Sequence, residues 1–379
     1  MYNLKIRLLY SSELKQAADL SDLVFGKPGQ PSMGKSFPAL FQPGISHSYG
    51  AFTDEGELVA FMGLAPDVMR IGEARLNVFS IGSVCTHPDY RGQNLASTLL
   101  AECMKHAQRS GASLVFVSGG RSLYRRADCY DFGRVHYAML DNGSASALLQ
   151  PDTDHWSISP MQPEDTFGIS GIISGTSPAY EQGPAQLLTL LGSSAIADIT
   201  LMRQETLIAR RNGTVEAFLA AAVPTVQPSV PAGEPAKAVE WGGHPQAVAR
   251  LLAETLQRQS AQRLEVPVPW QEQTLLNLLQ QAGAAVKSGP NSGTVWIADA
   301  QSLLTQCSPL LKVDWKSFIR IEEAAGGRSY TLTNKGQELV LDDSGLLSLL
   351  FDPESPHLAW APEAFGTIPL PYLAGLHYI

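Results

Sequence analysis

The chain has 379 residues, a length that at roughly 100–200 residues per domain suggests two or three domains. Its 44% hydrophobic and 17% charged residues exclude a wholly disordered or fibrous protein. With Lys+Arg 27 against Asp+Glu 36, the formal net charge is -9, which makes the surface a poor ligand for nucleic acid or anionic lipid.

Targeting signals are not evident at the start of the chain. Residues 1–7 lack the basic segment and apolar segment of a secretion signal, so we expect a cytoplasmic protein. The longest apolar stretch, 217–223, ends at Pro224 and is too short to span a bilayer, so we expect no membrane partner. The cysteines are widely spaced with no Cys-x-x-Cys pair, which favours reduced, buried thiols and predicts no metal. They are Cys85, Cys103, Cys129 and Cys307.

A strand, a loop, a helix and a second strand are predicted between residues 77 and 117. Apolar residues recur at about every second position in 77–85, which is typical of a strand. Residues 86–94 are rich in turn formers, and 114–117 form a short apolar run that reads as a buried strand. Between them, apolar residues at fourfold spacing predict one face of a helix. These residues are Leu95, Leu99, Cys103 and Ala107.

The loop before this helix is a candidate anion site. A turn-rich loop that opens a helix presents unpaired backbone N–H groups, and the helix dipole adds positive potential there. Gly92 permits close approach of a ligand to the backbone, and Asn94 tolerates a left-handed conformation. The loop therefore suits a pyrophosphate, although a plain strand-to-helix connection is the alternative.

The residues of this loop resemble a known motif. The pattern Val-x-x-His-Pro-x-Tyr-Arg-Gly-Gln-Asn-Leu-Ala at 84–96 is similar to the acyl-CoA-binding motif of the GNAT superfamily of N-acetyltransferases, with Asn94 in place of the usual central Gly. The resemblance implies an α/β (α+β) fold with mixed sheets flanked by helices, and acetyl-CoA as co-substrate. It also implies the cofactor-binding residues: Ser83, Val84, Cys85, Arg91, Gly92, Gln93, Asn94, Leu95, Ala96 and Ser97.

A second element of the resemblance follows at 121–127, which is similar to the GNAT helix that carries a tyrosine near the thiol of CoA. Residues 129–133 resemble the Gly-Phe/Tyr turn after it, with Cys129 in place of the usual glycine. A departing thiolate must be stabilised or protonated, and a phenol with a pKa near ~10 can donate to it. Tyr124 is therefore the candidate catalytic acid. The alternative is an ordinary half-buried tyrosine hydrogen-bonded through its hydroxyl.

The chain contains an internal repeat. The hairpin predicted at 48–62 recurs at 206–219, and the Leu-Leu-Ala-Glu sequence at 99–102 recurs at 251–254, again before a short strand. We therefore expect two related folds in tandem. The second copy lacks the loop motif and the tyrosine. Trp241 and His244 in its loop are interpreted as parts of a structural turn. The Pro-rich stretch 224–235 is interpreted as an exposed connection within this copy and not as a domain boundary.

From residue 295 on, the sequence predicts a small α+β segment. We expect a helix near 300–311, strands near 317–322, 329–333 and 338–341, and a short apolar helix or turn at 346–351. Two GNAT-like folds followed by such a segment resemble the enhanced-intracellular-survival type of aminoglycoside and lysine N-acetyltransferases, whose last domain is sterol-carrier-like. We expect a catalytic GNAT domain at 1–145, a degenerate one at 146–293 and a sterol-carrier-like domain at 294–379.

In that family the C-terminus enters the active site, where its carboxylate can take part in deprotonating the amine. By this resemblance the carboxylate of Ile379 is a second candidate catalytic group. An α-carboxylate with a reference pKa of about 3.5 is a weak base unless desolvated, so His377 or a bound water is an alternative. Simple packing of the tail is the other interpretation.

Together these patterns predict an acetyl-CoA-dependent N-acetyltransferase in which a small-molecule or peptide amine attacks the thioester directly. Cys85 as a covalent nucleophile is disfavoured, because no paired base is evident. A non-catalytic acyl-CoA-binding or regulatory protein is the alternative, suggested by Asn94 and Cys129. The acidic chain hints at cationic acceptors such as polyamines, aminoglycosides or lysines. The oligomeric state is left open, with a homo-oligomer as one option.

Overall fold

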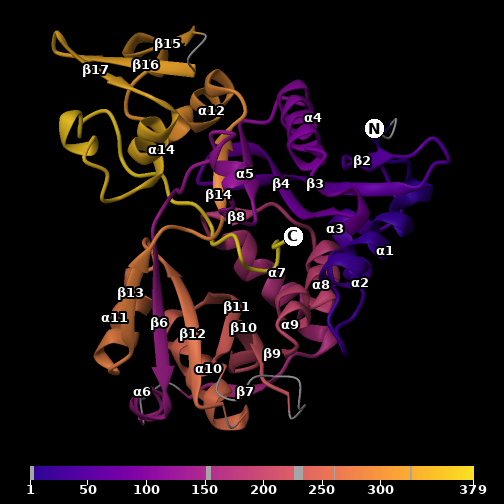
Figure 1. Ribbon diagram of the computed structural model, residues 1–379. Helices are drawn as coiled ribbons and strands as arrows, with labels where there is room; N and C mark the ends of the chain where they lie inside the picture. The colour runs from indigo at the N-terminus through magenta and orange to yellow at the C-terminus, as the bar shows by residue number, and fades with distance from the viewer. Residues whose placement is uncertain (1–3, 151–154, 226–233, 260, 325–326) are drawn as a thin grey trace.

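The computed structural model describes residues 4–150, 155–225, 234–259, 261–324 and 327–379. Two large sheets lie one above the other in Figure 1, and a smaller sheet packs at one corner. This mixed α+β architecture confirms the expected fold class. Residues 226–233 of the Pro-rich stretch 224–235 lie outside the described residues.

The first sheet has the order β1-β2-β3-β4-β5-β14, and β8 pairs with β3. All its neighbouring strands are antiparallel except β4 and β5, which are parallel. Its strands are β1 (Lys5–Leu8), β2 (Tyr49–Phe52), β3 (Leu58–Ile71), β4 (Ala74–Thr86), β5 (Leu114–Val117), β8 (Ala179–Tyr180) and β14 (Thr294–Ile297).

Helices cover both faces of this sheet, and each face has its own apolar core. One face carries α1 (Leu14–Phe25), α2 (Met33–Ser36) and α3 (Pro38–Phe41). The other carries α4 (Leu95–Arg109) and the single turn α5 (Ser122–Arg125). The predicted apolar face of α4 is confirmed, because all of its apolar residues named above are buried.

The second sheet has the order β13-β6-β12-β11-β10-β9-β7. Its strands are β6 (Val135–Asp141), β7 (Ser157–Pro160), β9 (Arg203–Arg211), β10 (Thr214–Val223), β11 (Ala236–Gly243), β12 (Arg263–Pro269) and β13 (Ala285–Gly289). The helices on its faces are α6 (Asn142–Leu148), α7 (Thr166–Gly175), α8 (Pro184–Ser193), α9 (Ala195–Ile199), α10 (Pro245–Gln259) and α11 (Gln273–Gln281). A hairpin leading to one parallel pair, β11 and β12, repeats the plan of the first sheet.

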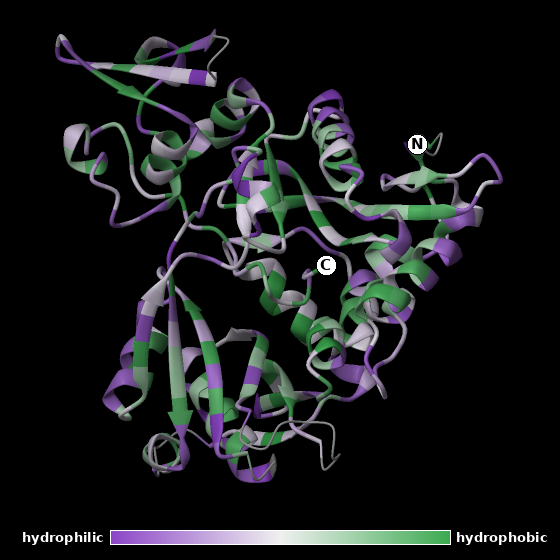
Figure 2. Cartoon of the chain, viewed as in Figure 1, coloured by the Kyte–Doolittle hydropathy of each residue, from purple (hydrophilic) through white to green (hydrophobic). Residues whose placement is uncertain are grey.

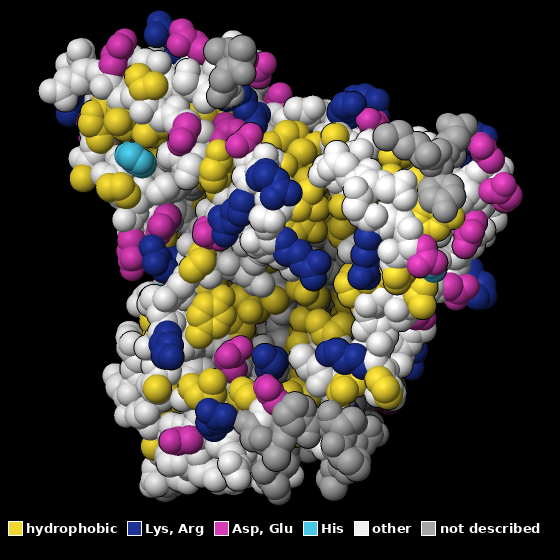
Figure 3. Space-filling model, viewed as in Figure 1, with side chains coloured by type: hydrophobic (Ala, Val, Ile, Leu, Met, Phe, Trp, Pro, Cys, Tyr) yellow, Lys and Arg dark blue, Asp and Glu magenta, His cyan; other side chains and the backbone are white. Residues whose placement is uncertain are grey.

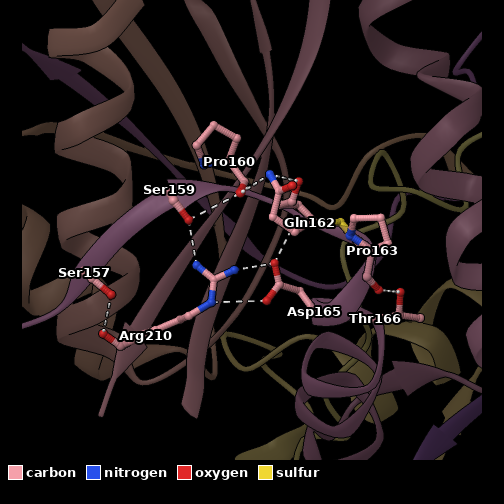
Figure 4. A network of polar contacts seen from close by, with 9 residues as sticks. Ser157, Ser159, Pro160, Gln162, Pro163, Asp165, Thr166 and Arg210 are labelled. Atoms are coloured by element: carbon pink, nitrogen blue, oxygen red, sulfur yellow. Dashed lines mark hydrogen bonds and ion pairs between the residues drawn. The ribbon is translucent and has the colours of Figure 1, made fainter. Parts of the chain in front are cut away.

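One edge of the second sheet is fixed by a buried ion pair. Asp165 at the start of α7 is 5% exposed and accepts hydrogen bonds from the guanidinium of Arg210 on β9. The same guanidinium donates to Ser159 Oγ on β7, 2.6 Å away. Figure 4 shows that this contact network joins β7, β9 and the first turn of α7.

The third segment forms a three-stranded antiparallel sheet in the order β15-β16-β17. Its elements are α12 (Ala300–Cys307), α13 (Trp315–Phe318), β15 (Ile319–Ala324), β16 (Gly327–Asn334), β17 (Gln337–Leu341) and α14 (Asp343–Phe351). Buried Tyr330 donates to Asp343 Oδ1 at 2.5 Å and ties β16 to α14. Figure 2 shows α14 as one of the most hydrophobic helices, and it shares a core with the ends of β3, β4 and β5.

Three strands cross the boundaries expected from the sequence. β8 lies within the second expected segment, 146–293, but pairs with β3 of the first sheet. β6 lies within the first expected segment, 1–145, but pairs with β12 and β13 of the second sheet. β14 opens the third expected segment, 294–379, but pairs with β5 of the first sheet. The segments therefore interlock, because each boundary strand pairs outside its own stretch of sequence.

Candidate functional site

The first sheet opens where β4 and β5 separate. The two strands pair from Val78 and Leu114 to Ile81 and Val117, after which β5 ends while β4 continues beside β3. A register shift between β3 and β4 accompanies a positive φ of 50° at Ser83. This bulge bends β4 away from β5 and leaves an opening through the sheet.

A cavity of about 880 Å³ lies at this opening and is lined from both faces of the sheet. The structure brings together seven of the residues predicted for the site: Ser83, Val84, Cys85, Arg91, Ala96, Tyr124 and Ile379. The remaining five continue the loop and the first turn of α4 beside the cavity without lining it: Gly92, Gln93, Asn94, Leu95 and Ser97.

The loop before α4 has the geometry expected of an anion cradle. Asn94 has φ of 59°, the left-handed conformation that the sequence allowed for it, and Gly92 also has a positive φ, of 80°. Within the described chain, none of the N–H groups from Gly92 to Ser97 is engaged by a hydrogen bond to the protein. They form the positive end of a 15-residue helix.

Tyr124 reaches the same cavity from α5. It is 6% exposed, and burial is the main cause that raises its pKa to about 12, while the nearby Arg121 charge partly offsets this. Among the described residues, no group is within hydrogen-bonding distance of its hydroxyl. The phenol is therefore protonated at neutral pH and free to donate to a ligand.

The C-terminus ends against β4. A Cβ atom built on Gly82 would collide with the terminal carboxyl group of Ile379, so only glycine leaves space for the tail there. Ile379 is 8% exposed, and Tyr378 beside it packs near Phe37 with ring centroids 6.2 Å apart. The carboxylate thus lies at the opening of the sheet, on the face covered by α1 and α2.

A buried polar network holds this tail. His377 Nδ1 lies 2.8 Å from Asp67 Oδ2, and the imidazole stacks on Tyr180 at 4.0 Å between ring centroids. The Leu376 N–H donates to Glu240 of the second sheet at 3.2 Å. Burial raises the pKa of Glu240, although that hydrogen bond and the His377 charge oppose the shift.

His377 does not line the main cavity. Its ring faces a separate small space of about 20 Å³, and its other nitrogen lies 3.2 Å from Gln182 Oε1. Both imidazole nitrogens are therefore occupied by protein partners. This geometry favours a role for His377 in anchoring the tail.

The four cysteines are unpaired and buried, as the sequence predicted. Burial raises the pKa of the Cys85 thiol to about 12, and its sulfur lies 3.7 Å from Ser21 Oγ. A thiol with that pKa is almost wholly protonated at neutral pH and is a poor nucleophile.

Part of the cavity is formed by residues that the sequence did not point to. Val24 and Phe25 at the end of α1, Lys27 and Gln30 in the following turn, and Met33 and Phe37 around α2 line one side. Ile199 from α9 lies with them. No motif marks these positions; only the packing of α1 and α2 on the sheet brings them to the opening.

The equivalent opening in the second sheet is largely filled. β11 and β12 pair over two registered residues and then separate around a cavity of about 110 Å³. Trp241 lines this space with the tail residues Pro371 and Tyr372, and its indole donates to the Pro267 carbonyl at 3.4 Å. His244 packs on Trp156 with ring centroids 5.6 Å apart, which agrees with the structural interpretation of this loop.

Metal-binding and membrane-spanning features are absent from the described residues. No group of three or more His, Cys, Asp or Glu side chains among them is arranged to hold a metal ion. Within the same residues, no helix has both the length and the apolar character needed to cross a bilayer.

Residues 5–132 match the acetyltransferase (GNAT) domain family. The matched segment includes the lining residues from α1, β4, the loop before α4 and α5, whereas Ile199, Tyr378 and Ile379 lie outside it. No curated protein matches the sequence.

Solved structures resemble the whole chain in fold. A conserved protein of unknown function from Enterococcus faecalis, described as a probable N-acyltransferase, aligns with a TM-score of 0.68 at 15% identity, covering 97% of this chain and 95% of that one. A GCN5-related N-acetyltransferase from Kribbella flavida gives 0.64 at 15% identity and covers 100% of both chains. Eis1 from Mycobacterium abscessus gives 0.62 at 13% identity, covering 98% and 99%. All three therefore share its arrangement of two large sheets and a third segment.

Proposed function

We propose that the first domain transfers an acetyl group from acetyl-CoA to a primary amine by direct attack within a ternary complex. The observation that carries this proposal is that one cavity, open through the sheet, is lined by the tyrosine hydroxyl and by the end of the chain. A donor for the leaving thiolate and a negative group near the amine thus face a common space.

Binding of the co-substrate rests on the loop before α4. Its unpaired N–H groups and the dipole of α4 suit the pyrophosphate, and Arg91, which is exposed at the cavity, adds a positive charge. The separated edge of β4 around Val84 offers backbone groups to the pantetheine arm. The thioester then lies between β4 and Tyr124.

The reaction forms one bond and breaks another at the thioester carbonyl carbon. The neutral amine nitrogen attacks this carbon, and collapse of the tetrahedral intermediate expels the CoA thiolate. Tyr124 donates a hydrogen bond to that thiolate, whose reference pKa of about 8.5 lies well below that of the phenol, so hydrogen bonding contributes more than full proton transfer. The Ile379 carboxylate, directly or through water, takes the proton of the amine.

Direct attack is preferred to a covalent acetyl-enzyme because Cys85 has no general base and a strongly raised pKa. Replacing Cys85 by Ser is expected to leave turnover within about twofold of the wild type, because no bond to its sulfur forms. Release of one equivalent of CoA thiol without any amine would contradict direct attack.

A C-terminal extension tests the proposal. Adding a few residues after Ile379 moves the carboxylate and places bulk where the amine must lie. Acetyl-CoA binding by calorimetric titration is expected to persist while amine-dependent thiol release falls by about 10²-fold or more, the usual size of a proton-transfer contribution. Full turnover of the extended chain would place the tail outside the site. Binding without turnover on any amine would instead support the alternative of a non-catalytic acyl-CoA-binding protein.

For the third segment, we infer a sterol-carrier-like domain with a structural role here. What supports it is a small antiparallel sheet packed on α14, which shares its core with the first sheet. From this position the segment directs residues 369–379 toward the opening between β4 and β5.

A further inference from the structure

The cavity is lined by elements from both faces of the first sheet. Arg91, Ala96 and Tyr124 come from elements on the α4 face, where the loop suited to pyrophosphate lies. The opposite face supplies a second set of lining residues around the chain terminus, and we call this set the acceptor side. It consists of Val24, Phe25, Lys27, Gln30, Met33, Phe37 and Ile199.

The acceptor side is mainly apolar. Phe25 and Ile199 are half-buried, and Met33 and Phe37 are buried against the core beneath α2. Gln30 is the uncharged polar member, and its Oε1 atom is buried without a hydrogen-bond partner. In Figure 3 the hollow on the visible face is lined by hydrophobic side chains, with Lys and Arg gathered around its rim.

The charges of the cavity are opposite to those of the whole chain. Among the described residues that line it, none is Asp or Glu, whereas Lys27, Arg91 and Arg121 are cationic. The terminal carboxylate is thus the one negative group in this lining set. The net charge of -9 resides elsewhere on the molecule, so the suggestion of polycationic acceptors drawn from it does not apply to this cavity.

The carboxylates of Asp22 and Asp198 lie close behind the acceptor side, but both already accept hydrogen bonds from protein groups. Asp22 accepts from Ser32 Oγ and from the Met33 N–H, each at 2.6 Å. Asp198 accepts from Ser36 Oγ at 2.6 Å, and burial raises its pKa. Neither carboxylate lines the cavity, so neither compensates a second charge on a bound amine.

We propose that the acceptor is a monoamine whose remaining part is apolar, such as an arylalkylamine or alkylamine. This inference rests on the proposed acetyl transfer and names its substrate class. One amine nitrogen meets the terminal carboxylate, and the aryl or alkyl group packs on Phe25, Met33 and Phe37. A polyamine or an aminoglycoside brings further positive charges beside Lys27, where no free carboxylate of the described lining faces them.

The test measures thiol release from acetyl-CoA with phenethylamine, hexylamine, spermidine and kanamycin at matched concentrations. We expect kcat/KM for the two apolar monoamines to exceed that for spermidine and kanamycin by about tenfold or more, since a desolvated unpaired charge strongly disfavours binding. Equal or higher values for spermidine or kanamycin would overturn the substrate class but leave acetyl transfer intact. Absence of thiol release with every amine, despite acetyl-CoA binding, would overturn the proposed function itself.

A pair of variants tests whether the acceptor side binds the apolar part of the amine. Phe25→Ala is expected to lower kcat/KM for phenethylamine by about tenfold, the usual effect of removing one apolar contact, with acetyl-CoA affinity unchanged. Leu23→Ala, on the same helix but 59% exposed and outside the lining, is the matched control. An equal loss in both variants, or no loss in Phe25→Ala, would contradict the assignment of the acceptor side.

A charge reversal tests the exclusion of polycations. Lys27→Glu places a carboxylate at the acceptor side and is expected to raise kcat/KM for spermidine relative to phenethylamine by about tenfold. Lys35→Glu makes the same change at an exposed position of α2 outside the lining and should leave the ratio unaltered. An unchanged ratio in Lys27→Glu would show that charge at this side does not select the acceptor.

Discussion

The hydroxyl of Tyr124 lies in surroundings that keep it protonated throughout the usual assay range. Replacing Tyr124 by Phe removes the donor and little volume, so we expect kcat to fall by about 10²-fold with acetyl-CoA affinity retained. Steady-state thiol release and calorimetric titration measure the two effects. Tyr130→Phe is the control, because Tyr130 lies after the same helix but outside the cavity lining. Wild-type turnover in Tyr124→Phe would exclude the proposed role.

The raised pKa of Tyr124 also predicts a pH profile. A donor must carry its proton, and its folded-state pKa of about 12 means that this proton is lost only as the pH approaches 12. The kcat profile should therefore show no Tyr124-dependent fall between pH 7 and about 10. A basic limb in that interval that disappears in Tyr124→Phe would contradict the assignment.

Two glycines at the ends of α4 provide a test of the phosphate cradle. Gly92→Asp places a negative charge at the helix N-terminus and should weaken acetyl-CoA binding by about tenfold, or ~1.4 kcal/mol. Gly111, after the other end of α4, has φ of 74° against 80° at Gly92, and a Cβ at either position meets open space. Gly111→Asp is therefore the matched control, because it introduces the same backbone strain at a position distant from the loop. A similar affinity in both variants would reject the cradle.

Among the elements, β4 determines where the tail ends. In Gly82→Ala, the new methyl group occupies the position of the Ile379 carboxyl, so the tail must shift. We expect amine-dependent turnover to drop by about 10-fold or more, because displacement by about one ångström is costly in a catalytic site. Acetyl-CoA affinity should change little. A crystal structure of the variant with the tail unmoved, or unaltered kcat, would contradict this account.

The elements that the sequence predicted well are those with a clear local period. The strand at 77–85, the helix starting at Leu95 and the strand at 114–117 were predicted within a few residues, because alternation and fourfold spacing depend only on near neighbours. Tyr124 was found through its resemblance to a family motif. The acceptor side has no such signal. In the sequence, Phe25 and Met33 are indistinguishable from ordinary core residues. Only the packing of α1 and α2 on the sheet places them at the cavity.

At the scale of the whole molecule, β6 pairs within the second sheet and β14 pairs within the first, so the two sheets depend on one another. A fragment ending at residue 145 keeps β6 without its partners and leaves β5 without β14. We expect this fragment to lack a cooperative thermal transition and to be rapidly proteolysed, because unpaired strand edges are unstable in water. Circular dichroism and limited proteolysis against the full chain measure this. A cooperative, soluble fragment would show that the first sheet is self-sufficient.

The sequence could not predict these strand pairings, for a physical reason. Strand patterns record which residues are apolar, but the partner of a strand is decided by packing over long sequence separations. β14 was therefore read as the start of a third segment, although its registered partner is β5. The tandem repeat itself was visible, because its hairpins and helices are local.

The places of β14 and Ile379 late in the sequence also bear on the order in which the first sheet and its cavity form during translation. Synthesis proceeds at about 5–20 residues per second and domains tend to fold as they emerge. Here the first sheet gains its edge strand only when β14 has been made, and the cavity gains Tyr378 and Ile379 later still. A nascent chain that has not reached these residues therefore holds the loop before α4 beside a cavity that lacks part of its lining.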